Sequence, residues 1–193
     1  MTSEYIYQVL RGKYHWRQNR YVVENCFVFD NWELDFFVVT KAGLGVEYEV
    51  KVSRSDFFAD MKKEAKHLTL STRRMYGTYQ EREGKRLVKK IRELDIPIKM
   101  PNRFYYVVPM DLIKLEEIPE YAGLMYVSNY QLIEVKKAPM LHKEKLDYKR
   151  FLTDKFYYYW QKSISELKWK SIEIDTLKRN VEALKNKLTS KVV

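Results

Sequence analysis

The chain has 193 residues, a length typical of one domain or of a domain with an appendage. Hydrophobic residues make up 46% of it, which allows a substantial core and excludes a chain that is disordered throughout. The formal net charge of +10 favours an anionic partner such as a nucleic acid.

The single cysteine, Cys26, excludes a disulfide framework and a cysteine-rich zinc site. No apolar run approaches the roughly 20 residues that span a bilayer, and the first residues do not resemble a secretion signal. These features together predict a soluble protein of a reducing compartment.

The basic residues are concentrated in two segments of the chain. Residues 61–103 hold 13 Lys and Arg against 5 Asp and Glu, and residues 143–193 hold 13 against 7. The rest of the chain is therefore mildly acidic. Either basic segment alone is typical of a solvated helix, but two of them around an acidic body also suit a groove for a polyanion.

Hydrophobic periodicity and turn residues predict alternating helices and strands. A helix capped by Ser3 is expected first, and a second helix is expected to begin at Ser53, with Asp56 completing its capping pattern. The spacing of the apolar residues in this second helix predicts one stripe made of Phe58, Met61, Ala65 and Leu68. The expected first helix covers residues 3–13, and the expected strands cover residues 20–30, 32–40, 46–52, 103–108, 124–127 and 131–136. This order predicts an α/β fold with a mixed central sheet flanked by helices.

The second and third expected strands form the most informative part of the sequence. A hairpin with a three-residue tip over residues 41–43, whose glycine takes the left-handed position, would pair residues whose numbers add up to 84. Asp35 then lies opposite Glu49 and Glu33 lies opposite Lys51, all on one face, because side chains alternate along a strand. The even-numbered residues form an apolar face on the other side. A two-residue tip would shift this alternation and separate the charged residues.

Two carboxylates opposite each other on a sheet carry an electrostatic cost. A divalent cation would remove the repulsion between Asp35 and Glu49, and oxygen ligands suit Mg²⁺ or Mn²⁺. Lys51 would then lie where a phosphate gains negative charge. The alternative is a solvent-exposed strand face with alternating charges and a Glu33–Lys51 pair.

The same residues resemble a known superfamily. Asp35 and Glu49-Val50-Lys51 match the D…ExK pattern of the PD-(D/E)XK, or restriction-endonuclease-like, nucleases. The run from Glu49 to Lys62, E-V-K-V-S-R-S-D-F-F-A-D-M-K, resembles the E-I-K-x-S-R-x-D-F-x-x-D-x-K run of the MmcB-like DNA-repair nucleases and their phage-borne relatives. Further similar segments are residues 32–35, 102–109, 118–124 and 137–142, so the resemblance covers roughly residues 5–145 apart from an insertion.

The resemblance implies a restriction-endonuclease-like core over residues 1–146, with a basic insertion at about 67–100. It implies a metal-dependent DNA nuclease that hydrolyses phosphodiester bonds in DNA repair, recombination or phage DNA processing. Such an enzyme would work in the cytoplasm of a bacterial cell or of a phage-infected host.

The resemblance also assigns roles to individual residues. Asp35 and Glu49 would bind Mg²⁺ or Mn²⁺ together with the backbone carbonyl of Val50. Glu33 would lie behind these ligands or replace one of them. Lys51 would act on the attacking water or on the scissile phosphate.

Basic and hydroxyl side chains around the expected site are candidates for contact with DNA phosphates. They are Ser53, Arg54, Lys62, Lys63, Lys66, Arg73, Arg74, Lys85, Arg86, Lys89 and Lys90. Residues 79–94 are expected to form a basic helix with Leu87, Ile91 and Leu94 facing inward. For Ser53 the alternative is simple helix capping, and for the basic helix it is a solvated surface.

Residues 147–193 are expected to form a C-terminal helical arm. Its apolar stripe, with three-four spacing, consists of Leu167, Ile174, Leu177, Val181, Leu184 and Leu188. The stripe predicts either packing on its own domain or a coiled-coil homodimer, which would bring two nuclease sites together. The alternative function for the whole chain is a non-catalytic DNA-binding or assembly module on a nuclease-like fold.

Overall fold

The structure is a computed structural model of the chain and describes residues 1–15, 19, 21–29, 32–83 and 86–189. The chain divides into two compact units, Met1–Phe151 and Leu152–Val193. The predicted boundary between residues 146 and 147 lies just before the last helix begins.

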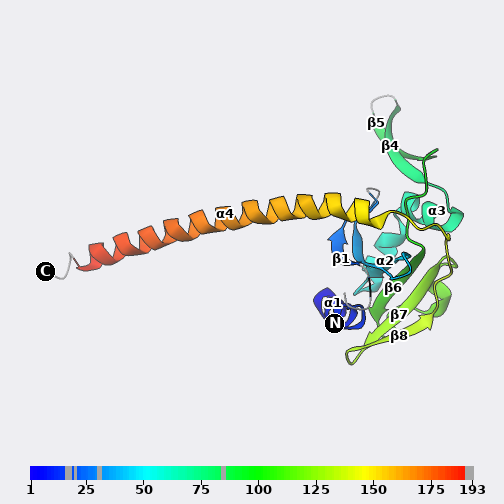
Figure 1. Ribbon diagram of the computed structural model, residues 1–193, viewed down its shortest axis with the longest axis horizontal. Coiled ribbons are helices and arrows are strands. Elements are labelled where there is room, and N and C mark those ends of the chain that lie inside the picture. Colours follow the sequence, from blue (N-terminus) through cyan, green and yellow to red (C-terminus); the bar gives the residue numbers. More distant parts are fainter. Residues whose placement is uncertain (16–18, 20, 30–31, 84–85, 190–193) are drawn as a thin grey trace. The chain divides into compact units, whose positions relative to one another are not determined.

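The first unit is built on a six-stranded mixed sheet with the strand order β1-β2-β3-β6-β7-β8 (Figure 1). Its strands are β1 (Tyr21–Cys26), β2 (Leu34–Val39), β3 (Gly45–Val50), β6 (Arg103–Pro109), β7 (Ala122–Ser128) and β8 (Gln131–Lys136). β6 runs parallel to both of its neighbours, and the other pairs are antiparallel.

A separate hairpin consists of β4 (Tyr76–Glu83) and β5 (Arg86–Glu93). The helices are α1 (Ser3–Lys13), α2 (Arg54–Met61), α3 (Glu64–Thr72), the short 3₁₀ helix η1 (Leu115–Glu117) and α4 (Tyr148–Thr189). The prediction of an α/β fold with a mixed sheet and helices is therefore confirmed.

The β2–β3 hairpin has the predicted register. Phe36 pairs with Tyr48 and Val38 with Val46, so the numbers of paired residues add up to 84. Gly43 has a φ of +81°, the left-handed conformation that the three-residue tip requires. The core that holds Ile6, Val9 and Leu10 of α1 also contains even-numbered residues of both strands, namely Phe36, Val38, Val46, Tyr48 and Val50. The odd-numbered residues consequently face the opposite side of the sheet.

Helix α1 differs from the prediction only in its cap. The hydroxyl of Thr2, not that of Ser3, accepts a hydrogen bond from the backbone N–H of Tyr5 at 3.3 Å. The first predicted strand is shorter than expected, and its end positions, residues 20 and 30, lie outside the described residues.

The segment after β3 forms two helices, and the predicted apolar stripe is wrong. Ser53 caps α2 as expected, accepting a hydrogen bond from the N–H of Asp56 at 3.2 Å. The side chain that packs inward is Phe57, edge-on against Tyr106 with ring centroids 4.9 Å apart, whereas Phe58 is 44% exposed. The chain leaves helical geometry between α2 and α3, so α3 begins with a new orientation. A single stripe across both helices therefore cannot form.

The predicted basic helix over residues 79–94 is also wrong, because residues 79–83 and 86–93 belong to the β4–β5 hairpin (Figure 1). Strand pairing places Lys90 within 2.8 Å of the Glu81 carboxylate and 2.6 Å of the Glu83 carboxylate. Leu87, expected to face inward, is 66% exposed. Opposite charges across the two strands stabilise the pairing, whereas the apolar residues do not form a buried helical face.

Asn102 ties several segments to the start of β3. Its side chain is fully buried, and its Oδ1 accepts hydrogen bonds from the Gly45 N–H at 2.7 Å and the Tyr148 hydroxyl at 2.8 Å. Its Nδ2 donates to the carbonyls of His142 and Glu144. Four polar partners around one buried amide hold residues 142–148 against the sheet.

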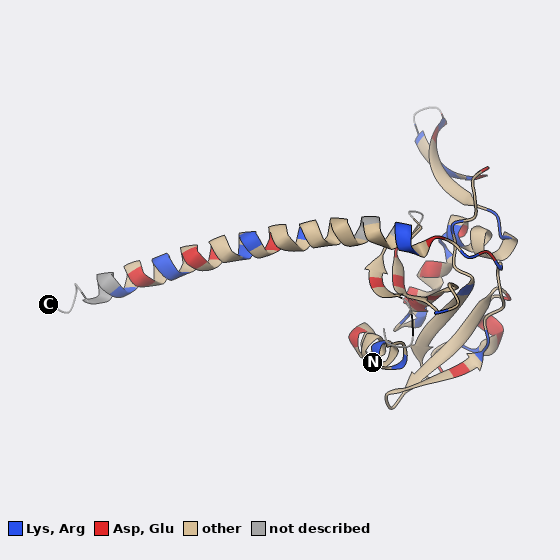
Figure 2. Cartoon of the chain, viewed as in Figure 1, with Lys and Arg blue, Asp and Glu red and all other residues tan. Residues whose placement is uncertain are grey.

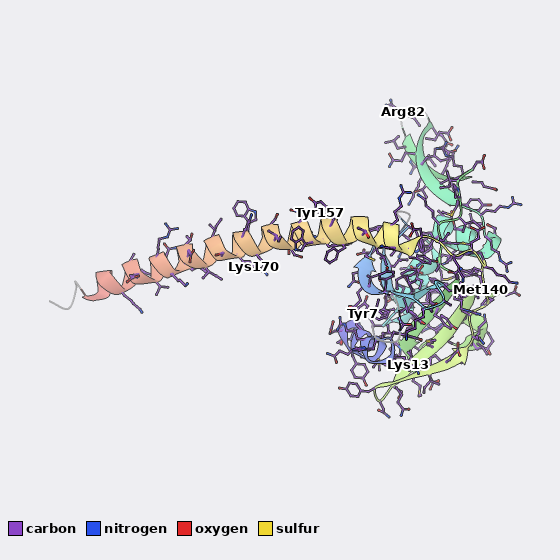
Figure 3. The ribbon with its side chains drawn as sticks, viewed as in Figure 1. Tyr7, Lys13, Arg82, Met140, Tyr157 and Lys170 are labelled. Atoms are coloured by element: carbon purple, nitrogen blue, oxygen red, sulfur yellow. The ribbon has the colours of Figure 1, made fainter. Side chains whose placement is uncertain are left out.

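The second unit is formed by α4, so the predicted long C-terminal helix is confirmed. Lysine, arginine and acidic residues are interspersed along it (Figure 2), and large side chains such as Tyr157 project from it (Figure 3). The five described members of the apolar stripe are 50–66% exposed, and the side chain of Leu188 lies outside the described part. The coiled-coil homodimer stays a prediction. Within the described ranges, no helix is both long enough and apolar enough to cross a membrane.

Candidate active site

Acidic and basic side chains gather where β2, β3, α2 and α3 meet. They are Asp35 of β2, Glu47 and Glu49 of β3, Lys51 directly after β3, Asp60 of α2, Lys63 between the two helices and Lys66 of α3. We call this group the acidic cluster. The two glutamates face it because the hairpin register places the odd-numbered residues of β3 on this side.

Three residues predicted to act together are in fact close together. The Lys51 ammonium donates a hydrogen bond to Glu49 Oε1 at 2.7 Å and lies 3.8 Å from Asp35 Oδ2. Asp35 Oδ2 also accepts a hydrogen bond from the Val50 N–H at 2.8 Å. Glu33 lies just before β2, is exposed, and has no ion pair with the acidic cluster among the described residues. The Glu33–Lys51 pair that belonged to the alternative of a solvent-exposed strand face is therefore not formed.

Lys66 is a central member of the acidic cluster. Its Nζ donates to Glu49 Oε2 at 2.8 Å and lies 3.5 Å from Glu47 Oε1 and 3.6 Å from Asp60 Oδ1. Its side chain is only 3% exposed. The expectation that Lys66 contacts DNA therefore does not fit the structure, since three carboxylates enclose its ammonium group.

Asp60 is a site residue that the sequence analysis did not select. Its Oδ2 accepts a hydrogen bond from the Tyr106 hydroxyl at 3.0 Å, and its Oδ1 lies 2.8 Å from the Lys63 ammonium. Oδ1 is buried, has no assigned hydrogen bond in the described part of the chain, and has the Lys63 ammonium as an ion-pair partner. Burial raises the pKa of Asp60, but Lys66 and Lys51 outweigh burial, and the net pKa is lowered. The sequence did contain a signal for this residue: Asp60 occupies the second aspartate position of the run that resembles the MmcB-like nucleases.

Glu47 forms the innermost part of the acidic cluster. It is fully buried, and the Trp32 indole N–H donates to both carboxylate oxygens, at 3.0 and 3.2 Å. Burial raises the pKa of Glu47 to about 8, although the nearby Lys66 ammonium opposes the shift. The pKa of Asp35 is raised to about 6, first by burial and then by Glu49, with Lys51 opposing. Both carboxyl groups therefore keep a proton at a higher pH than they would in an unfolded chain.

This difference makes folding stability depend on pH. In a chelating buffer, we expect the free energy of unfolding to fall by about 1–3 kcal/mol between pH 5 and 8, because the unfolded carboxyl groups lose protons at lower pH than the folded ones. The folded pKa values of about 6 for Asp35 and about 8 for Glu47 set this window. The midpoint of urea unfolding measures the effect.

The Glu47→Gln variant is the matched control for this pH dependence. It should remove most of the decline between pH 6 and 8, because glutamine does not titrate. A wild-type stability that is constant or rises over this range would contradict the assignment. The same slope in both proteins would also contradict it.

The remaining candidates for DNA contact have different surroundings. Ser53 caps α2, and Arg54 forms two hydrogen bonds with the Glu117 carboxylate. Arg74 pairs with Glu93, and Lys90 pairs with glutamates of its own hairpin. The exposed candidates without an ion pair among the described residues are Lys62, Arg73, Arg86 and Lys89. Lys85 lies outside the described residues.

The residues present fit a divalent cation by the chemistry of their donors. Asp35 and Glu49 supply carboxylate oxygens, and Asp60 Oδ1 is buried beside them without a hydrogen-bond donor. Mg²⁺ and Mn²⁺ prefer oxygen ligands of this kind. Both oxygens of Glu49 bind lysine ammonium groups, so a cation would compete with Lys51 and Lys66. Among the residues that the structure describes, no group of three or more His, Cys, Asp or Glu side chains is already arranged to hold a metal.

Comparisons with known proteins bear on the fold alone. No protein-family model matches the chain, and no curated protein matches it. A solved structure of a protein of unknown function from Silicibacter pomeroyi is similar, with a TM-score of 0.50 and 21% sequence identity. The similarity covers 83% of this chain and 88% of that chain. It supports a shared α/β arrangement of strands and helices.

Proposed function

We propose that the chain is a metal-dependent DNA nuclease with a restriction-endonuclease-like core, which hydrolyses phosphodiester bonds through Asp35, Glu49 and Lys51. One observation carries the proposal: the β2–β3 register, together with the position of Lys51 directly after β3, brings these three side chains close together. Lys51 Nζ lies 2.7 Å from Glu49 and 3.8 Å from Asp35. The resemblance to the PD-(D/E)XK nucleases supports the same three residues.

Asp35 and Glu49 would hold Mg²⁺ or Mn²⁺, with the carbonyl of Val50 and the buried Oδ1 of Asp60 as further oxygen donors. A bound ion of this kind makes hydroxide available near neutral pH and polarises a phosphoryl oxygen.

Lys51 would supply a positive charge at the reacting phosphate. Burial lowers its pKa, but attraction from Glu49 and Asp60 outweighs burial and raises the pKa overall. Lys51 therefore keeps its proton at neutral pH. A fixed cation in a buried site can stabilise the charge that develops on a phosphoryl group during attack.

Surface charge supports a nucleic acid as the partner. The chain carries a net +10, and four of the exposed candidate cations have no ion pair among the described residues. Such cations bind the phosphate backbone largely without regard to base sequence. DNA repair, recombination or phage DNA processing in a bacterial cytoplasm is the setting that the resemblance favours.

The direct test is incubation of single-stranded, double-stranded and branched DNA with the full chain and Mn²⁺. We expect cleavage of at least one substrate, its loss in EDTA, and a decrease of about 10³-fold or more in Asp35→Asn. The variant should keep its DNA affinity, since the exposed cations are unchanged. Intact substrates under all metal conditions would contradict the proposal.

A second candidate is a non-catalytic DNA-binding or assembly module, favoured by one observation. Both Glu49 oxygens already bind ammonium groups, so the acidic cluster can balance its charges without a metal. This candidate predicts DNA affinity that is unchanged or improved in Asp35→Ala, with no cleavage by the wild type. If α4 performs the assembly, deletion of residues 147–193 should abolish function and Lys51→Ala should have no effect.

A further inference from the structure

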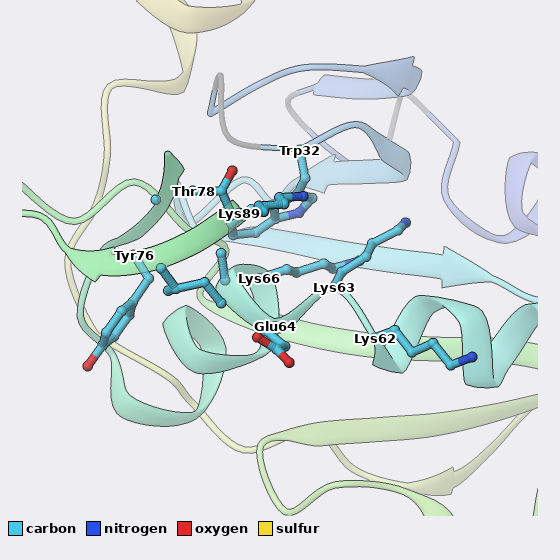
Figure 4. Close-up of a pocket in the computed structure, with 11 residues that line it drawn as sticks. Trp32, Lys62, Lys63, Glu64, Lys66, Tyr76, Thr78 and Lys89 are labelled. Carbon is cyan, nitrogen blue, oxygen red and sulfur yellow. The ribbon is translucent and has the colours of Figure 1, made fainter. Parts of the chain in front are cut away.

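A pocket lies between the α2–α3 segment and the β4–β5 hairpin, next to the acidic cluster (Figure 4). Its volume is about 630 Å³. Lys63 and Lys66 line it from the α2–α3 segment, and Lys62 lies at its margin with its side chain directed away from the hairpin (Figure 4). Tyr76 and Lys89 come from the hairpin, and Trp32 forms part of the wall. Lys63 and Lys66 line the pocket and are also members of the acidic cluster, so the two adjoin each other.

The charges of the pocket suit an anion. Among the described residues, four lysines and one acidic residue, Glu64, line it. Lys63 and Lys66 are paired with the acidic cluster. Lys62 and Lys89 are exposed and have no ion pair within the described ranges, so their ammonium groups are available to a ligand. Unpaired cations beside a carboxylate-rich site favour a phosphate-bearing molecule.

The pocket also offers aromatic surface and a suitable size. Trp32, which is buried, and Tyr76, which is half-buried, are the aromatic residues among those that line it. Nucleobases stack on aromatic side chains whatever the base, because every base has a π-face. A volume of about 630 Å³ lies within the range of small-molecule sites and can accept one nucleotide.

We propose that this pocket binds one unpaired nucleotide of a nucleic-acid strand, with lysines contacting its phosphate and aromatic side chains contacting its base. The inference rests on the proposed nuclease function and adds the class of substrate. A base inside a duplex is stacked and paired, so it must leave the helix before it can enter a pocket. Single strands, flaps and frayed ends are therefore the preferred substrates, and blunt duplexes are poor ones.

The test measures DNA binding in EDTA, where cleavage does not occur. Fluorescence anisotropy compares a labelled single-stranded oligonucleotide with a blunt duplex of the same sequence. We expect the wild type to bind the single strand more tightly, and Lys62→Ala/Lys89→Ala to weaken that binding by about tenfold or more. Duplex affinity should change by less than about threefold, because its bases do not enter the pocket.

The matched control removes the same number of charges elsewhere. Lys41 in the β2–β3 tip and Lys137 after β8 are exposed and do not line the pocket. Lys41→Ala/Lys137→Ala should weaken single-strand binding by less than about threefold. An equal loss of single-strand affinity in both double variants would contradict binding in the pocket and indicate general electrostatic attraction.

The ring of Tyr76 is tested separately from charge. Tyr76→Phe keeps the ring and should retain single-strand affinity, whereas Tyr76→Leu keeps apolar bulk and should lose about fivefold or more. Both variants lose the same 3.4 Å hydrogen bond to Glu93, so this contact does not explain a difference between them. Equal affinities of the two variants would overturn the stacking contact.

The outcomes separate this inference from the proposed function. If the wild type binds and cleaves DNA while the pocket variants bind single strands normally, the pocket inference fails and the nuclease stands. If the wild type binds neither form of DNA, both fail. If single-strand binding depends on the pocket but no metal supports cleavage, the pocket stands as part of a binding module.

Discussion

Replacing Lys51 with methionine is expected to lower the rate of DNA cleavage by about 10²–10³-fold. The reason is that the variant removes a cation 2.7 Å from Glu49 and 3.8 Å from Asp35, where the phosphate would react. DNA affinity should change by less than about threefold, because Lys51 is almost fully buried and is not part of the exposed basic surface. Single-turnover cleavage with Mn²⁺ separates the chemical step from binding.

Lys63→Met is the matched control for this experiment. The Lys63 ammonium lies 3.9 Å from Glu49, but its side chain is 54% exposed and interacts mainly with Asp60. The control should lose less than about tenfold in rate, because solvent screens an exposed charge. Equal losses in the two variants would contradict a special role for Lys51.

Replacing Lys66 with methionine is expected to reduce the free energy of unfolding by about 3–5 kcal/mol, the usual cost of leaving buried partner charges unpaired. The ammonium of Lys66 lies within 3.6 Å of Glu47, Glu49 and Asp60, and burial removes water as an alternative partner. Methionine fills much of the same volume as lysine, so packing changes little. The decrease in the free energy of unfolding is therefore due mainly to the removed charge. Urea unfolding at pH 7 in EDTA measures the difference.

Two further variants test the cause of this loss. Lys63→Met should cost only about 0–1 kcal/mol, as exposed ion pairs do. Adding Glu49→Gln to Lys66→Met should recover part of the stability, because the carboxylate that binds the Lys66 ammonium at 2.8 Å then carries no charge. A stability loss in Lys66→Met that is no larger than that of Lys63→Met would contradict the central place of Lys66 in the acidic cluster.

The position of Asp35, Glu49 and Lys51 could be predicted from sequence because it depends on local rules. The glycine in the tip selects a three-residue turn, the turn sets the register, and the alternation of side chains then assigns each residue to a face. The register and Gly43 conformation in the structure confirm these steps. The metal and phosphate chemistry expected from the opposed carboxylates and from the resemblance stays a prediction, because the register does not specify it.

The parts that could not be predicted depend on tertiary contacts. The chain leaves helical geometry between α2 and α3, and Lys66 of α3 lies 2.8 Å from Glu49, a contact between residues distant in sequence. Residues 79–94 have apolar spacing that also suits a helix, but ion pairs such as Lys90–Glu81 form across the two strands. In both places the sequence pattern was compatible with more than one structure, and contacts between distant residues decided the result.

Mn²⁺ binding tests most directly the metal site that we propose Asp35 and Glu49 share. Electron paramagnetic resonance can follow free Mn²⁺ as the full chain and the Asp35→Asn variant are titrated, with a single-stranded oligonucleotide present. The account predicts a saturable Mn²⁺ site in the wild type whose affinity falls by about tenfold or more in the variant. Equal Mn²⁺ binding by the two proteins, or no saturable binding by the wild type, would contradict a divalent ion held between Asp35 and Glu49.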